Sequence, residues 1–473
     1  MDNSRGNWSS NLGFLLAAIG SAVGLGNLWG FPYKMGANGG FAFLIVYLVL
    51  AAMVGFVIMV SEIAIGRKTG LGIVGAFRQY TSHCKWVGFL GLIVPVMIMF
   101  FYSVLGGYCI EYIAINLGDL GFNTLSSSGA DLFTSMLTNP VGCVVFTFFF
   151  LAVCYLIVKS GISGGIEKFN KIGMPALFVL LVIVIIKSVS LPGASEGLKF
   201  MFKPDFGYLS ENFITVLSVA GGQMFFSLSL AMGIMVTFGS YLSKGESITK
   251  NAAIITISDT VVAIMAGMAV LPAAFALGGE DAAMAGPKLL FITLQDVFNA
   301  MGDLIGPLFG VFFYTLVLLA ALTSAISLSE VPATMYVDRC HKKGKEPNRS
   351  RATFIVCLII FAGAALVAAD GLGSNGLWVP FQDSLGIHGW NDCWLDFVDF
   401  ISEGVLMPFS AFITSIIVGW IMKPESVHEE VIQEGNKFTA YGFYKFCIKF
   451  FVPIAMLFIL VGQVDSFLGL GIF

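Results

Sequence analysis

Residues Ser21–Pro32 read SAVGLGNLWGFP, in the middle of an apolar segment long enough to cross a membrane. Three glycines, an asparagine and a proline all weaken a helix. In hydrocarbon every backbone N–H and C=O needs a partner, so non-helical backbone is tolerated only where protein or a water-filled cavity surrounds it. The stretch therefore predicts a helix broken inside the protein, although Gly20 and Gly24 also form the GxxxG pattern of simple helix packing.

A second apolar segment is interrupted in the same way, GGQMFFSLSLAMGIM at Gly221–Met235. It lies five spans after the first, and interrupted helices at matching positions of two halves indicate a transporter binding site. An odd spacing makes the two halves inverted. Freed N–H groups at a half-helix N-terminus attract a carboxylate. Freed carbonyls, with Asn27 and Ser227, suit a hard monovalent cation. The pattern predicts a carboxylated solute that travels with a cation.

The remainder of the chain is typical of a polytopic membrane protein. Of 473 residues, 57% are hydrophobic and only 11% are charged, against about 25% charged in soluble domains. A span needs about 20 apolar residues. Eleven such segments are present, near 11–35, 40–66, 87–117, 141–158, 170–190, 212–241, 251–277, 304–336, 352–369, 395–422 and 439–471.

The basic residues predict how these spans are oriented, because cytoplasmic loops collect Lys and Arg. We expect the amino terminus in the cytoplasm and the carboxyl terminus outside a cell membrane. We expect spans one to five (1–190) and six to ten (210–422) to be inverted repeats, with an additional span at 439–471, in one transport domain. Five of the 25 basic residues then lie at or beyond the outer face: Lys34, Lys187, Lys199, Lys203 and Lys288.

The composition does not indicate a nucleic-acid-binding protein, a disulfide framework or an enzyme. The net charge of −4 carries no nucleic-acid signal, and the eight cysteines have no CxxC pair. A membrane-embedded enzyme would need a nucleophile with its base or a metal cluster. Glu62, Glu111 and Glu330 have no histidine partner in the spans, so we expect no enzyme.

Several motifs in their order resemble the neurotransmitter:sodium symporter family, in particular its bacterial LeuT-type amino-acid transporters. The motifs run from Arg5 to about Phe451: RGNW, SAVGLGN…FPY, NGGFAF, SGISGGIEKFNKIGMP, FFSLSLAMG and LTSAISLSEV. The resemblance implies an all-α LeuT-type fold with helices 1 and 6 broken. It also implies sodium-coupled symport of an amino acid by alternating access.

The resemblance implies two sodium sites. The first would use the Ala22 carbonyl, Asn27, Ser227 and Ser258, which stands where the family normally has Asn. The second would use the carbonyls of Gly20, Val23 and Ala320 with the hydroxyls of Thr323 and Ser324. Without the resemblance, those two hydroxyls could equally bond to the preceding helical turn.

The implied substrate site has a polar end and an apolar wall. Its polar end comprises Ser21, Ala22, Leu25, Gly26 and the hydroxyl of Tyr102. Its pocket comprises Ile98, Phe226, Ser227, Ser229, Met232, Ser324 and Leu328. Gly24 replaces the Asp of amine transporters, which implies a substrate with its own carboxylate. An unpaired polar group against the apolar wall would be costly, so a neutral, hydrophobic amino acid is expected. Ala231, where many relatives have Gly, favours medium-sized aliphatic side chains, and aromatic ones stay open.

Two gates follow from the same resemblance. The inner gate maps onto Arg5, Trp8, Ser240, Tyr241 and Asp338, in which the Arg–Asp pair closes the exit; a basic residue there otherwise serves as a membrane anchor.

The outer gate departs from the family. The basic residue expected at Gly30, above Phe226, is missing, and the acid corresponds to Asp399. Lys34 shares a helical face with Gly30 and could reach Asp399, although Pro32 hinders that geometry; otherwise Lys34 is simply solvated.

Asp259 is an acid inside a predicted span, where a charge is costly and functional by default. It lies about one turn from Val262, the position of a chloride-binding serine in animal relatives. We expect chloride-independent transport with Asp259 supplying the negative charge; the alternative is an acid at a helix end, in contact with water.

Most relatives have a twelfth span, which this sequence does not contain. Its absence puts the family's dimer contacts in doubt, so a monomer or weak homodimer is expected. Because Gly30 lacks the gate residue, a non-transporting amino-acid receptor is the alternative function.

Overall fold

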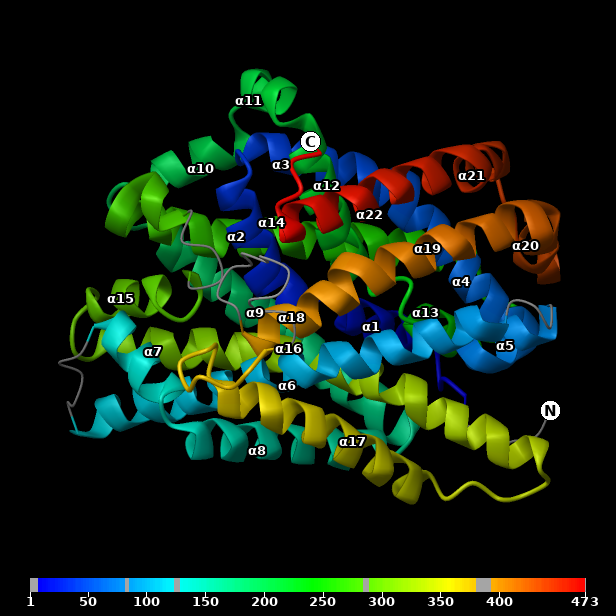
Figure 1. The fold of residues 1–473 in the computed structure, drawn as a ribbon, viewed down its shortest axis with the longest axis horizontal. Coiled ribbons are helices and arrows are strands. Elements are labelled where there is room, and N and C mark those ends of the chain that lie inside the picture. Colours follow the sequence, from blue (N-terminus) through cyan, green and yellow to red (C-terminus); the bar gives the residue numbers. More distant parts are fainter. Residues whose placement is uncertain (1–6, 81–84, 123–127, 284–288, 380–392, 473) are drawn as a thin grey trace.

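Long helices form nearly all of the structure, a computed structural model that describes residues 7–80, 85–122, 128–283, 289–379 and 393–472. Within those ranges no β-strand is present. Nine helices are long and apolar enough to cross a membrane, and one bent pair raises the number to as many as ten. The long helices run along the longest axis of the molecule (Figure 1). The predicted all-α class is confirmed.

The nine unbroken spans agree with segments expected from hydropathy. In chain order they are α3 to α4 (Phe41–Thr69), α6 (Lys85–Phe122), α8 (Pro140–Val158), η5 to α9 (Ile162–Val189), α14 (Ile248–Ala283), α16 (Ile305–Lys342), α17 (Arg349–Asp370), α18 to η8 (Trp394–Ile421) and α21 to α22 (Tyr441–Leu468). Short helices connect them: α5 (Ile73–Tyr80), α7 (Gly129–Leu137), α10 (Ala194–Phe202), α11 (Phe206–Glu211), α15 (Thr293–Asn299) and α20 (Pro424–Val431).

The first broken helix consists of α1 (Asn11–Ala22), the π-turn η2 (Gly26–Gly30) and α2 (Phe31–Ala37), with a bend of 42°. The helix stops because Val23 is extended, with φ −77° and ψ 92°. Asn27 then caps the break, since its Oδ1 accepts a hydrogen bond from the Gly24 nitrogen at 3.0 Å. A side chain at Gly24 would collide with Ser324 and Tyr102. Glycine is therefore needed here for close packing as well as for the break.

The second broken helix consists of α12 (Phe213–Ser227) and α13 (Ile234–Gly239). Between them Ser229, Ala231 and Gly233 have φ values of 54°, 61° and 78°. A left-handed residue other than glycine costs about 1 to 3 kcal/mol, so the neighbouring structure must hold this segment. Glu62 does so in part, because its Oε1 accepts a hydrogen bond from the Ala231 nitrogen at 2.8 Å.

The predicted span at 212–241 is thus the pair α12 and α13, of 15 and 6 residues, each too short to cross alone. The breaks predicted in both segments are confirmed. The total of eleven spans remains a prediction, because length and composition support nine or ten in the described ranges.

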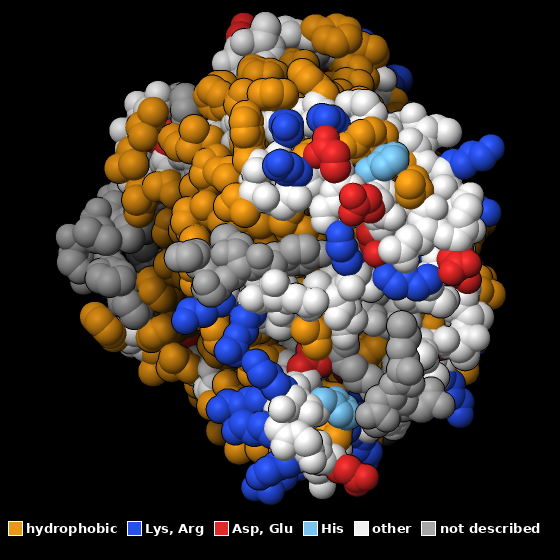
Figure 2. All heavy atoms as spheres, turned by 90° about the vertical axis from the view of Figure 1, so that its right-hand side faces the viewer, with side chains coloured by type: hydrophobic (Ala, Val, Ile, Leu, Met, Phe, Trp, Pro, Cys, Tyr) orange, Lys and Arg blue, Asp and Glu red, His pale blue; other side chains and the backbone are white. Residues whose placement is uncertain are grey.

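The surface separates apolar from charged regions. Large apolar side chains are exposed along the outer helices, including Val141, Ile172 and Phe354 at 71%, 69% and 56%. Figure 2 views the end of the molecule where α20 lies, and Lys and Arg side chains gather there among Asp and Glu. An apolar belt with a charged end is what a membrane-spanning bundle presents to lipid and water.

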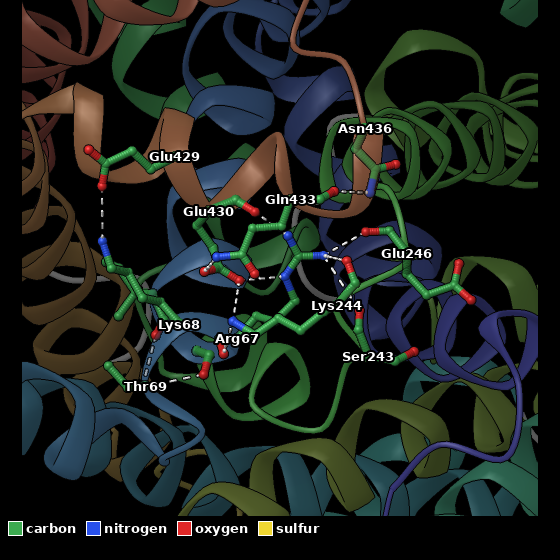
Figure 3. A network of polar contacts seen from close by, with 12 residues as sticks. Arg67, Lys68, Thr69, Ser243, Lys244, Glu246, Glu429, Glu430, Gln433 and Asn436 are labelled. Carbon is green, nitrogen blue, oxygen red and sulfur yellow. Dashed lines mark hydrogen bonds and ion pairs between the residues drawn. The ribbon is translucent and has the colours of Figure 1, made fainter.

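A buried ion pair joins three segments at that charged end (Figure 3). Arg67, in the last turn of α4, is 3% exposed, and its Nε donates to Glu430 Oε1 of α20 at 2.7 Å. The guanidinium also donates to the Glu246 carbonyl, at 2.6 Å, in the loop after α13. Lys244 from this loop contacts the same Glu430 oxygen at 2.8 Å. The network fixes α20 against α4 and the loop after α13.

Candidate functional site

The two breaks face each other across one cavity. Its lining comes from both broken helices, α6 and α16: Ser21, Ala22, Gly24, Gly26, Tyr102, Phe226, Ser229, Met232, Ser324 and Leu328. Every lining residue except Gly24 is an expected substrate residue. Leu25, Ile98 and Ser227 are buried close by but do not line the cavity. The lining combines polar groups near the breaks with an apolar wall.

The hydroxyl of Tyr102 lies at the polar end of the cavity. It accepts a hydrogen bond from the Leu25 nitrogen at 3.0 Å, and a hydroxyl can in addition donate its own proton. The Phe226 ring lies edge-on to the Tyr102 ring, with 6.3 Å between the centroids. The Tyr102 hydroxyl can thus donate a hydrogen bond to a carboxylate that lies beside the Phe226 ring.

Serine side chains join the two breaks directly. Ser229 donates to the Ser21 carbonyl at 2.8 Å, and Ser21 donates to the Ser229 hydroxyl at 3.2 Å. Ser324 of α16 donates to the same carbonyl at 2.9 Å. Backbone groups that the breaks release are therefore partly satisfied by hydroxyls, as buried polar groups must be.

Oxygen atoms of α1 and α16 converge beside the cavity. Thr323 Oγ1 lies 2.9 Å from the Ala320 carbonyl and 3.4 Å from the Val23 carbonyl. Ser324 Oγ lies 3.5 Å from the Gly20 carbonyl. The Thr323 hydroxyl therefore bonds to its own preceding helical turn and also lies near the carbonyl that follows α1. The set holds only carbonyl and hydroxyl oxygens, which suit a hard cation such as Na⁺.

A carboxylate stands at the centre of the other expected cation set. Asp259 of α14 is fully buried and accepts from Asn27 Nδ2 at 2.8 Å. Ser227 Oγ lies 3.0 Å from both carboxylate oxygens, and Tyr47 donates at 3.1 Å. Asp259 is not an acid in water. Its neighbour Ser258 is only partly buried and forms none of these bonds, so the structure brings Asp259, rather than Ser258, to Asn27 and Ser227.

Gly30 lies close to the end of the Gln223 side chain. A Cβ there would lie 2.8 Å from the side-chain oxygen of Gln223, whose nitrogen donates to the Gly26 carbonyl at 2.6 Å. A side chain at position 30 would therefore require Gln223 to move.

Lys34 forms its ion pair with a residue that the sequence reasoning missed. Its Nζ lies 3.9 Å from Oε2 of Glu403, in the π-turn η7 (Phe400–Leu406). The expected partner, Asp399, lies one turn earlier at the end of α18 (Trp394–Asp399). The i, i+4 spacing places the two acids on one helix face, but it does not show which of them meets Lys34.

The described part of the inner gate is well packed. Trp8 donates to the Phe238 carbonyl at 3.1 Å, and its ring lies 6.5 Å from that of Tyr241. Asp338 accepts from the Gly72 nitrogen at 2.8 Å. The Ser240 hydroxyl bonds within its own turn, to the Thr237 carbonyl at 2.7 Å. Arg5 lies outside the described residues.

A second ion pair lies near the inner gate. Arg349 at the start of α17 pairs with the buried Glu330 of α16. The Tyr241 hydroxyl lies 2.9 Å from that of Thr334 and 3.3 Å from Glu330. The sequence reasoning treated Glu330 only as an acid without a histidine partner and so missed this contact.

The described ranges contain no group of three or more His, Cys, Asp or Glu side chains that could hold a metal ion such as zinc. The oxygen sets around the breaks are the candidates for cations.

Sequence comparison then identifies the family. The model of the Sodium:neurotransmitter symporter family matches residues 5–126 and 136–471. The chain belongs to this family. It is therefore a sodium-dependent transporter in a multi-pass membrane fold, as its relatives are, and not an enzyme.

Among similar curated proteins of this symporter family is the uncharacterized sodium-dependent transporter YhdH of Bacillus subtilis, 33% identical over 97% of both chains. A sodium-dependent transporter of Methanocaldococcus jannaschii is 31% identical over 90% of this chain and 84% of its own. The crystal structure of MhsT in complex with L-phenylalanine superposes with a TM-score of 0.85 and 34% identity, covering 97% of this symporter and 100% of MhsT. The LeuT-type fold is confirmed.

Proposed function

We propose that the chain imports a neutral, hydrophobic amino acid together with sodium, by alternating access and without chloride. The observation that carries the proposal is the cavity between the two broken helices, with hydroxyl and amide groups at one end and an apolar wall at the other. An α-amino acid has the same division of polar and apolar groups.

The apolar wall supports the hydrophobic side chain. Phe226, Met232 and Leu328 line the cavity, where a polar substrate group would be left without partners. The polar end offers the Tyr102 hydroxyl to a carboxylate. MhsT, a similar structure, is in complex with L-phenylalanine, which has this chemistry.

The two oxygen sets support two sodium ions. Asp259 would supply the negative charge to the set that includes Asn27 and Ser227, which removes the need for a bound anion. Each sodium entering gains about 2.3 kcal/mol per 100 mV, or about 4.6 kcal/mol for two with a zwitterion. At about 1.4 kcal/mol per tenfold, this supports roughly thousandfold accumulation.

The orientation and assembly are part of the same proposal. The basic end of the molecule would face the cytoplasm, with the carboxyl terminus outside, because cytoplasmic loops collect Lys and Arg. Residues 1–190 and 210–422 would form the inverted repeats beside the span at 439–471, in a monomer or weak homodimer.

Uptake of labelled amino acids into proteoliposomes tests the proposal. We expect accumulation of one or a few apolar amino acids with an inward sodium gradient, none with potassium, and no change when gluconate replaces chloride. Preferred uptake of a charged amino acid over leucine, methionine and tyrosine would contradict the substrate class. Saturable binding without accumulation would indicate the receptor instead.

A further inference from the structure

A second cavity lies among α9, α14, α15 and α16, away from the two breaks. Its volume of about 260 Å³, mouth included, is close to the 250 Å³ of the cavity at the breaks. α15 lies at the end of the molecule opposite α20 (Figure 1). The lining is mostly apolar and includes Leu294, Phe298, Phe309 and Phe313. Its residues belong to neither the proposed substrate site nor the proposed sodium sites.

The cavity owes its space to small side chains and opens towards lipid. Ala269 and Ala273 stand one turn apart on α14, where larger apolar residues would fill the hollow. Beside the lining, Ile186 of α9 is 63% exposed, and Ile305 and Leu308 of α16 are 48% and 39% exposed. Apolar side chains exposed on a membrane-spanning bundle face the bilayer. A molecule that enters between α9 and α16 therefore comes from the lipid phase.

Two polar groups at the end of α9 line this apolar cavity. Ser188 is 3% exposed, and its Oγ has no hydrogen-bond partner among the described residues. A buried hydroxyl without a partner is costly, which points to a ligand that supplies one. Lys187 is half-buried, with its Nζ 6.0 Å from the centre of the Phe309 ring. The described residues place no carboxylate within ion-pair distance of this ammonium.

We propose that this second cavity, the lipid cavity, binds one anionic phospholipid. The phosphate lies beside Lys187 and Ser188 and accepts hydrogen bonds from both, as basic pockets between membrane helices bind lipid head groups. Part of one acyl chain fills the apolar hollow over Ala269 and Ala273. A phospholipid is favoured over a free fatty acid because the mouth opens to the bilayer, where phospholipids are the bulk component. The bound lipid would contact α14 and α16, the helices that also carry Asp259 and Thr323.

Native mass spectrometry of the purified protein tests the site without any transport. The probes are dioleoyl-phosphatidylglycerol, dioleoyl-phosphatidylcholine and oleate, each added to delipidated protein. We expect one phosphatidylglycerol to be retained in preference to phosphatidylcholine. Lys187→Met keeps the apolar stem but removes the charge, so it should lower this retention about fivefold, since a basic residue near the head groups contributes about 1 kcal/mol.

Two further variants sharpen the comparison. Ala273→Leu fills the hollow and should also lower retention. Lys203→Met is the control, because Lys203 is an exposed basic residue after α10 that does not line the cavity. It should retain the lipid like the wild type. Equal retention of phosphatidylcholine, or equal loss in Lys187→Met and Lys203→Met, overturns the proposal. Oleate that displaces phosphatidylglycerol would overturn the phospholipid in favour of a single-chain carboxylate.

Thermal unfolding in detergent gives a second readout. Phosphatidylglycerol should raise the unfolding temperature of the wild type and of Lys203→Met by a few degrees, because a ligand bound by the folded state stabilises it. Lys187→Met should gain much less, although without lipid it unfolds at the same temperature as the wild type. An equal gain in all these proteins would show a general effect of lipid and would overturn the lipid cavity.

Discussion

The carboxylate of Asp259 lies 2.8 Å from the side-chain nitrogen of Asn27, inside the helix bundle and fully buried. Asp259→Asn keeps the shape and removes the charge. We expect the sodium concentration for half-maximal uptake to rise about tenfold or more, because a cation loses an oppositely charged neighbour. Sodium titrations of uptake measure this. Ser258→Ala is the matched control and should behave like the wild type; the reverse pattern would reassign the site to Ser258.

Thr323 contributes a hydroxyl to the other oxygen set, so Thr323→Val should weaken sodium binding while keeping the side-chain shape. We again expect about a tenfold rise in half-saturating sodium. Thr353 offers a matched control, since it is equally buried but only bonds to the Arg349 carbonyl one turn before it. If Thr353→Val and Thr323→Val change sodium dependence equally, the Thr323 hydroxyl has only a structural role.

Gly24→Ala should abolish substrate binding, because the new methyl group would collide with Ser324 and Tyr102 at the polar end of the cavity. Binding of labelled substrate to purified protein measures this. Gly118→Ala in α6 is the control, since a Cβ there meets nothing within 4 Å. That variant should bind normally and gain up to about 1 kcal/mol in helix stability. Normal affinity in Gly24→Ala would contradict the cavity as the substrate site.

Arg67→Met should destabilise the protein by about 3 kcal/mol, because it removes the buried guanidinium that pairs with the buried Glu430 and leaves the partly exposed Lys244 as the remaining charged partner. Unfolding in detergent, followed by intrinsic fluorescence, measures the loss. Lys68→Met is the control: its partner Glu429 is 72% exposed and 3.8 Å away. Such a surface pair contributes less than about 1 kcal/mol. Equal decreases in the free energy of unfolding in both variants would show that the buried Arg67 pair stabilises the protein no more than the exposed Lys68 pair does.

The helix breaks could be predicted because their cause is local. Gly24, Ser229 and Gly233 stand in apolar runs where a regular helix would have larger apolar residues, and the structure breaks at these residues. The left-handed conformation of Ala231 could not be predicted, since alanine has no local preference for it. Two hydrogen bonds to residues distant in sequence hold this segment: the Ala231 nitrogen donates to Glu62, and the hydroxyl of the nearby Ser229 donates to the Ser21 carbonyl.

The residues around the site were harder to predict because they depend on register between helices. One residue along a helix rotates a side chain by about 100°, which separates the buried Asp259 from the partly exposed Ser258. Glu403 was missed because its partner, Lys34, belongs to another helix and both are ordinary charged residues in the sequence. Contacts of this type become visible only after the helices are packed.

The hydrogen bond between Glu62 and Ala231 also has a consequence for biosynthesis. The two residues are separated by 169 positions, so α4 is complete before the segment that it holds has been made. At about 5 to 20 residues per second, the wait is roughly ten to thirty seconds. During this time an acid in the middle of an apolar helix has no native partner. Insertion of α4 into the bilayer therefore depends on the translocation machinery, or on water retained beside the helix, until the second half of the chain arrives.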